Sequence, residues 1–407
     1  MRVLLYTGKG GVGKTTTAAA TAAWAARYGL RTLVLSADSA HSLGDVLERR
    51  LGPEPLAVAD NLEAVEVDAR AEMARHWGHI RDYLISLFRY QGIEEVVAEE
   101  LALLPGAEEL ATLFAVETLA HEGDHDLVVV DCAPTDAALR LATLPEVARA
   151  SMRVALRIQG AIARVATPLA SMVVPAPLPD ADVFGDVESL VFNTLRKLRA
   201  RLTSTSTSVR LVVTPERMVI DEARRAYTEL CLFDLACDGV VMNRMLPEDA
   251  LGEPFFASRA ELEAKRLEEV EDAFAPLPVR VAPLRQDEVS GLDALVAHGE
   301  ALFEGGDPTE GADRSARIRY GRVGDGYSVT IPLAGEAGAP GASDLALDVV
   351  KLDDELLLRV GSRRRALRLP PRMMTCDLVG AKRKDDRLEV TLGPPERAGH
   401  PPVAGEA

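Results

Sequence analysis

Residues 6–22 read YTGKGGVGKTTTAAATA and lie between an apolar run at 3–5 and an alanine-rich stretch that continues to residue 26. A strand, a glycine-rich loop and a helix in this order form a phosphate-binding loop, because backbone N–H groups at the start of the helix converge on phosphate oxygens. We expect Lys14 to contact the β and γ oxygens of ATP and the Thr15 hydroxyl to bind Mg²⁺. The expected nucleotide-binding residues of this loop are Lys9, Gly10, Gly11, Val12, Gly13, Lys14, Thr15 and Thr16.

The composition is that of a globular protein with a sizeable core, since 47% of the 407 residues are hydrophobic and 27% are charged. The sequence has neither an apolar run of membrane-spanning length nor a signal peptide, which favours a cytoplasmic location. The cysteines are scattered and no pair has zinc-site spacing, so we expect no zinc ion and no disulfide framework. They are Cys132, Cys231, Cys237 and Cys376.

The net charge of −17 is unevenly distributed along the chain. The acidic excess lies in residues 1–316, whereas residues 317–394 carry a small basic excess. An acidic domain repels phosphate backbones, so nucleic acid is not expected as a partner.

The first 303 residues predict an α/β domain with a doubly wound parallel sheet. Short apolar runs alternate with helical patterns, which is typical of parallel strands buried on both faces. Two segments, at about 62–120 and 146–208, are expected to be largely helical, the second as an insert that interrupts the alternation. Besides the three runs before residue 132, we expect strands at 209–216, 237–245 and 279–284, the last followed by a helix to about residue 303.

The composition changes after residue 303. Residues 304–316 are predicted to be a linker, 317–394 an all-β sandwich of short alternating strands, and 395–407 a disordered tail. Within the sandwich, the arginines at 363–365 are interpreted as a solvated strand edge that deters aggregation.

The stretch GKGGVGKT at 8–15 resembles the deviant Walker A loop of arsenite-pump ATPases, tail-anchored-protein targeting factors, partition and septum-site ATPases and nitrogenase iron protein. In that family the extra lysine, here Lys9, reaches across a dimer interface to the nucleotide of the other subunit. The resemblance therefore implies a homodimer in which Lys9 stabilises charge on the leaving oxygens. From the residues alone, a cation at this position only helps to neutralise a triphosphate.

Two further stretches resemble the switch segments of the arsenite and tail-anchor ATPases. SADSAHSL at 36–43 matches their first switch, which implies that Asp38 orients the attacking water and that His41 is structural. DCAPTDAALRLATLPE at 131–146 matches their second switch, which implies that Asp131 supports the Mg²⁺ shell. An aspartate at the end of a strand could instead cap a helix. Asp136 and Ala137 depart from the family's Gly-His pair.

TPERM at 214–218 and NRM at 243–245 resemble the adenine-side segments of the family. Glu216 and Asn243 are therefore expected to contact the nucleotide or its neighbours, because the amide of asparagine suits the adenine edge. Asn243 as a turn residue is the alternative. Residues 345–392 resemble the α-crystallin domain of small heat-shock proteins.

These features favour a homodimeric Mg-ATP-hydrolysing switch that acts as a chaperone or targeting factor for hydrophobic or membrane-protein segments. Its apolar insert at 151–174 would contact the client, although ordinary core or dimer packing explains the same pattern. One alternative is an ATPase that drives arsenite or metalloid efflux, which the scattered cysteines oppose. Another is a holdase regulated by nucleotide. The sequence identifies neither the client nor a membrane partner.

Overall fold

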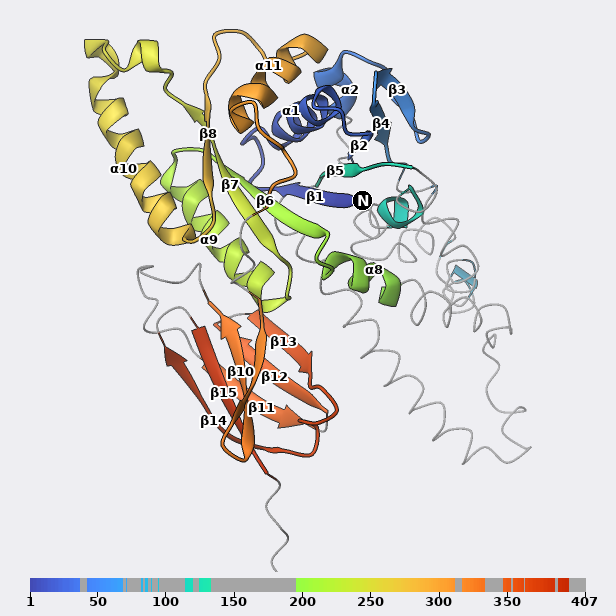
Figure 1. The fold of residues 1–407 in the computed structure, drawn as a ribbon, viewed down its shortest axis with the longest axis vertical. Helices are drawn as coiled ribbons and strands as arrows, with labels where there is room; N and C mark the ends of the chain where they lie inside the picture. The colour runs from blue at the N-terminus through green and yellow to red at the C-terminus, as the bar shows by residue number, and fades with distance from the viewer. Residues whose placement is uncertain are drawn as a thin grey trace, which may run out of the picture.

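The computed structural model describes residues 1–36, 42–68, 114–119, 124–132, 195–311, 317–333 and 347–394 except 353, 362, 385 and 386, together with a few isolated residues between 71 and 94. These residues form an α/β domain and a smaller β domain, the latter comprising residues 317–333 and 347–394 (Figure 1). Every helix in the described ranges is too short or too polar to cross a bilayer.

The α/β domain is built on one eight-stranded sheet with the order β3-β4-β2-β5-β1-β6-β7-β8. All neighbours pair in parallel except β3, an edge strand that runs antiparallel to β4. Strands β2, β5 and β6 are buried along their whole length, as their Val- and Leu-rich runs predict. The strands are β1 (Arg2–Thr7), β2 (Thr32–Ser36), β3 (Leu56–Ala59), β4 (Leu62–Glu66), β5 (Leu127–Asp131), β6 (Thr207–Val213), β7 (Cys237–Met245) and β8 (Val279–Pro283).

Helices cover both faces of this sheet, which confirms the predicted fold class (Figure 1). On one face, α11 packs so closely on α1 that a Cβ on Gly299 would lie 2.3 Å from the backbone oxygen of Ala20. Helices α8, α9 and α10 lie over the other face. The described helices are α1 (Lys14–Arg27), α2 (Ser42–Leu47), α8 (Leu195–Leu202), α9 (Arg217–Leu232), α10 (Ala257–Phe274) and α11 (Leu292–Phe303).

The β domain is a sandwich of two antiparallel sheets, with the strand orders β14-β15-β10-β9 and β11-β12-β13. Alternate residues of the facing strands, among them Val329, Leu358 and Val390, are buried between the sheets. The predicted all-β architecture is therefore confirmed. The strands are β9 (Arg319–Val323), β10 (Gly326–Pro332), β11 (Leu347–Leu352), β12 (Glu355–Val360), β13 (Arg363–Arg368), β14 (Asp377–Lys384) and β15 (Arg387–Gly393).

Two local predictions differ from the structure. The segment expected to be largely helical from residue 62 begins instead with strand β4, which pairs with β3 just before it, and most of the rest of the segment lies outside the described residues. The arginine run at 363–365 is a solvated edge only at Arg364, since the side chain of Arg363 is 13% exposed and Arg365 is 5% exposed. Alternate side chains of β13 point to one face, and there the two arginines meet α9.

Candidate functional site

The register of the sheet brings Asp131 to the phosphate loop. Strand β5 lies between β1 and β2, and Asp131 at its carboxyl end pairs with Tyr6 on one side and Ser36 on the other. The loop leaves β1 one residue beyond Tyr6, so the carboxylate faces the first turn of α1. There it accepts hydrogen bonds from Thr15 Oγ1 at 2.7 Å and from Ser36 Oγ at 3.2 Å. Asp131 thus binds α1 rather than serving only as a strand terminus.

The backbone of the loop needs glycine at two positions where other chain segments approach. A Cβ on Gly8 would lie 2.3 Å from the backbone oxygen of Val212 in β6. Gly13 has φ +91°, and a Cβ there would lie 2.4 Å from Nδ2 of Asn243. Gly13 caps the amino end of α1 in the left-handed conformation that glycine adopts most readily. The N–H groups of the first turn of α1 have no partner within the helix and are therefore available to a ligand in the loop.

The two lysines of the loop have different environments. Lys14 is buried, and its ammonium group donates to the backbone oxygen of Lys9 at 3.2 Å. That acceptor is neutral, so a phosphate in the loop would supply the counter-charge that a buried ammonium favours. The side chain of Lys9 is 36% exposed and lies 3.5 Å from a carboxylate oxygen of Glu222 on α9. Only Lys14 therefore lies inside the loop.

Hydroxyl and carboxylate oxygens gather beside the loop in a set that fits Mg²⁺. Thr15 Oγ1 lies 2.7 Å from Asp131 Oδ2 and 3.2 Å from Ser42 Oγ, at the start of α2. Mg²⁺ prefers such hard oxygen ligands and completes its octahedron with water and phosphate. The donor set therefore suits a nucleotide-bound Mg²⁺.

Asn243, near the carboxyl end of β7, binds the loop that leaves β1. Its Nδ2 donates to the backbone oxygen of Val12 at 2.8 Å, and its Oδ1 accepts from the N–H of Arg244 at 2.9 Å. One N–H of the amide is left for a ligand. Glu216, which precedes α9, is exposed, and its carboxylate accepts from Thr214 Oγ1. Thus Asn243 adjoins the loop, whereas Glu216 lies at the start of α9.

Several predicted residues lie outside the described part of the chain. They are Asp38 and His41 of the first switch, Asp136 and Ala137 of the second, and the apolar insert at 151–174. Three residues that the sequence analysis did not single out lie at the site. Ser36 and Ser42 belong to the quoted SADSAHSL stretch, which was the available signal, whereas no sequence pattern marks Glu222.

The four cysteines are buried, and Cys132 directly follows Asp131 of the loop's oxygen cluster. Burial, and then the neighbouring charge of Asp131, raises the pKa of Cys132 to about 12. Burial, and then Asp238, holds the pKa of Cys237 well above its ordinary value. At these two cysteines, burial and a neighbouring carboxylate thus disfavour the thiolate form that binds soft metals.

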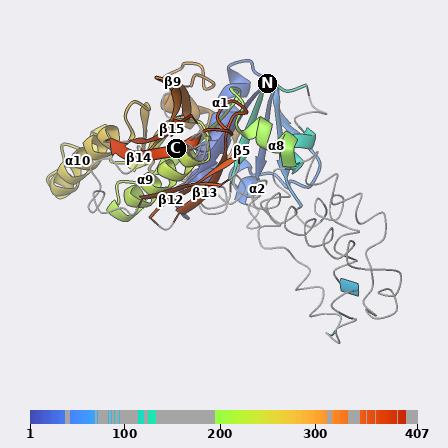
Figure 2. The same ribbon diagram turned by 90° about the horizontal axis from the view of Figure 1, so that it is seen from below.

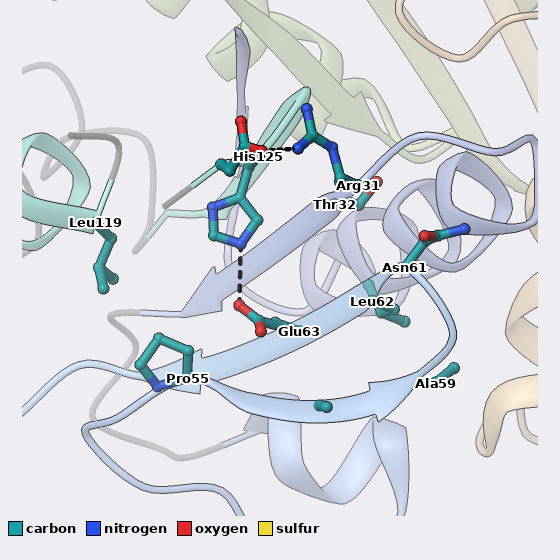
Figure 3. Close-up of a pocket in the computed structure, with 11 residues that line it drawn as sticks. Arg31, Thr32, Pro55, Ala59, Asn61, Leu62, Glu63, Leu119 and His125 are labelled. Carbon is teal, nitrogen blue, oxygen red and sulfur yellow. Dashed lines mark hydrogen bonds and ion pairs between the residues drawn. The ribbon is translucent and has the colours of Figure 1, made fainter. Parts of the chain in front are cut away.

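A cavity of about 660 Å³ lies at the amino ends of β2, β4 and β5, away from the carboxyl ends where the phosphate loop lies (Figure 3). In it, the Nε2 of His125 lies 3.0 Å from a carboxylate oxygen of Glu63. A second cavity of about 440 Å³ lies beyond the carboxyl ends of β7 and β8, lined by Pro247, Leu284 and His298 among others. Of the two, only the second opens at the end of the sheet that carries the loop.

Comparison with known protein families gives two matches. Residues 1–304 match the anion-transporting ATPase family, and residues 324–392 match the HSP20-like domain found in ArsA. Together they cover most of the chain.

Curated relatives match over nearly the same length. The chain is 31% identical over 402 residues to a protein of Aquifex aeolicus named putative arsenical pump-driving ATPase 1, covering 96% of this chain and 100% of the relative. It is 34% identical over 395 residues to the putative arsenical pump-driving ATPase of Chlorobaculum tepidum, covering 96% and 95%. ATPase ASNA1 homolog 2 of Paramecium tetraurelia is 26% identical over 309 residues, which are 73% of this chain and 92% of that protein.

Proposed function

The chain belongs to the anion-transporting ATPase family and hydrolyses ATP, and we propose that it works as an Mg²⁺-dependent homodimeric switch for an apolar protein client. The observation that most strongly supports the switch is that the two lysines of the loop differ in burial. Lys14 is buried in the loop, whereas Lys9 is partly exposed at its mouth, where a weak ion pair with Glu222 holds its ammonium group.

In this proposal each residue of the site has one task. The N–H groups of residues 10–15 and the ammonium group of Lys14 bind the phosphates. Thr15 binds Mg²⁺ and Asp131 orients Thr15, while the bound ion neutralises charge on the phosphate oxygens. Asp38, from the first switch, orients the attacking water. Asn243 holds the loop and offers its remaining N–H to the base.

Lys9 completes the site of a second copy. The chain has one phosphate loop, so a lysine that stabilises the leaving oxygens in trans requires a homodimer. Hydrolysis per chain should therefore fall on dilution below the dimer dissociation constant. Activity that is independent of chain concentration would contradict the dimer.

The client is proposed to be a hydrophobic or membrane-protein segment. Support comes from the similarity to ATPase ASNA1 homologs and from the HSP20-like domain. The test is a titration of a fluorescent apolar helical peptide against Asp38→Asn protein loaded with ATP, with ATP-free Lys14→Ala protein as the control. We expect saturable binding only in the ATP-loaded protein. Equal binding of the peptide to both proteins would favour the alternative, a holdase whose client binding is regulated by nucleotide but does not require it.

An arsenical-pump role is the second candidate, because relatives with nearly full coverage are named putative arsenical pump-driving ATPases. The buried thiols oppose it, since metalloids of this class bind thiolates. The assay is ATP hydrolysis with and without arsenite. A several-fold stimulation that is lost in a cysteine-free variant would replace the client hypothesis.

A further inference from the structure

Helix α9 lies beside the β domain (Figures 1 and 2), and its side chains contact both that domain and the phosphate loop. Its Glu222 faces the loop, where it approaches Lys9. Its Glu229, two turns further along the helix, and Phe233 just beyond its end face the β domain. One straight helix thus links the lysine of the loop to the C-terminal domain.

The contact between Lys9 and Glu222 occupies the lysine within its own chain. The Nζ and the carboxylate oxygen are 3.5 Å apart, and the two side chains are 36% and 31% exposed. A pair with this exposure is weak enough to break when a triphosphate or a partner competes for the lysine. Asp221, the adjacent acidic residue of α9, instead approaches Arg217 at 3.8 Å.

The contact between α9 and the β domain is more buried. Nε of Arg363 donates to Oε1 of Glu229 at 2.7 Å, and the side chains are 13% and 26% exposed. The guanidinium of Arg365 lies over the ring of Phe233, with its carbon 5.4 Å from the ring centroid. A charge-assisted hydrogen bond and a cation–π contact in a partly desolvated interface fix this part of the helix more firmly than an exposed ion pair would.

We propose that Glu222 is a positioning residue for Lys9, which it holds within its own chain in the nucleotide-free state, and that the β domain fixes the helix that carries Glu222. The C-terminal domain thereby restrains the lysine that serves the second subunit. This inference rests on the proposed action of Lys9 in trans. It assigns Arg363 and Arg365 of β13 a role in controlling hydrolysis.

Carbodiimide coupling tests the contact directly, without hydrolysis. This zero-length reagent joins an amine and a nearby carboxylate into an amide with loss of water, and mass spectrometry identifies the joined peptides. We expect a Lys9–Glu222 product within one chain of the nucleotide-free protein, and less of it with a non-hydrolysable ATP analogue. Absence of the product, or a yield that nucleotide does not change, would overturn the proposal.

Charge exchange tests the part played by the β domain. Arg363→Glu and Glu229→Arg should each lower the Lys9–Glu222 yield by about twofold or more, and the double variant should restore it. Arg364→Glu, on the exposed side of the same strand, is the matched control. A restored cross-link yield in the double variant would show that the single variants act by breaking the Arg363–Glu229 pair and not by damaging the β domain. A double variant as low as the singles, with unchanged thermal unfolding, would show that the β domain does not fix the helix.

Hydrolysis gives the functional readout. Glu222→Gln should raise kcat per chain by about two- to fivefold at low chain concentration with little change in KM, because the lysine is released without altering ATP binding. Asp221→Asn, the matched control, should behave as wild type. If Lys9→Ala is inactive and Glu222→Gln equals Asp221→Asn, the positioning role is wrong while the role of Lys9 stands. If Lys9→Ala is fully active, the proposed function itself fails.

Discussion

Replacing Gly13 by alanine should weaken ATP binding far more than the same change at Gly10. Gly13 has φ +91°, and its added Cβ would lie 2.4 Å from Nδ2 of Asn243. A left-handed conformation costs a non-glycine residue about 1–2 kcal/mol. Displacing Asn243 breaks its hydrogen bond to Val12, which contributes about 0.5–1.5 kcal/mol.

These terms sum to about 1.5–3.5 kcal/mol, or about a 10-fold to 300-fold loss of affinity if the loop must be restored to bind phosphate. Fluorescent-nucleotide titration measures the affinity, and thermal unfolding shows how much of the cost falls on stability. Gly10→Ala is the control, since no atom lies within 4 Å of its added Cβ and alanine keeps the N–H. It should bind within about threefold of wild type.

The double variant Gly13→Ala/Asn243→Ala separates the two terms. It removes the close contact but not the positive φ, so we expect it to bind ATP more tightly than Gly13→Ala and less tightly than wild type. If Gly13→Ala binds and unfolds like Gly10→Ala, the geometry described for this loop is not the one that binds nucleotide.

Three further predictions concern hydrolysis and stability. Asp38→Asn should bind ATP normally in the same titration but hydrolyse it about 100-fold more slowly in a phosphate-release assay, whereas undiminished turnover would assign the water to another carboxylate. Asp238→Ala should lower the free energy of unfolding in urea by about 3–5 kcal/mol, because it leaves the buried Arg210 without the carboxylate that lies 3.0 Å from its Nε. Burial, and then the charge of Arg285, lowers the pKa of His298 in the folded protein to about 4. The stability that the neutral His298 contributes is therefore complete above the unfolded pKa near 6.5, and it is lost as the pH falls toward 4. This loss should reach about 1–3 kcal/mol, and His298→Gln should flatten the urea-unfolding profile between pH 7 and pH 4.5; an unchanged slope would contradict it.

The fold could be predicted where burial is complete on both faces. The runs LVVV at 127–130 and GVVM at 239–242 show this, because a parallel strand buried on both faces leaves an unbroken apolar pattern. The β3–β4 hairpin could not be predicted in this way. Its edge strand LAVA has only four residues and is largely exposed, and its partner LEAVE mixes apolar with acidic residues, so neither has the length or the alternation that marks a strand.

In the candidate site, too, only the residues that belong to a local sequence pattern could be predicted. Gly13, Lys14 and Thr15 follow from a local pattern whose geometry is set by neighbours in sequence. Glu222 and the buried role of Arg363 depend on helix α9 lying against both the loop and β13. Contacts between segments this distant in sequence are made by tertiary packing, and the sequence pattern of either segment alone does not specify them.

Subunit complementation asks most directly whether Lys9 acts across the dimer. Lys9→Ala chains and Asp38→Asn chains are each expected to be inactive, and they are mixed in equal amounts and allowed to exchange. In a mixed dimer, the site of the Lys9→Ala chain keeps its own Asp38 and receives an intact Lys9 from the Asp38→Asn chain. Action in trans therefore predicts one working site in each mixed dimer, or about a quarter of the wild-type rate at statistical exchange. If Lys9 serves only its own chain, each site of the mixed dimer keeps one defect, and a mixture that forms dimers but stays inactive would contradict the dimeric switch.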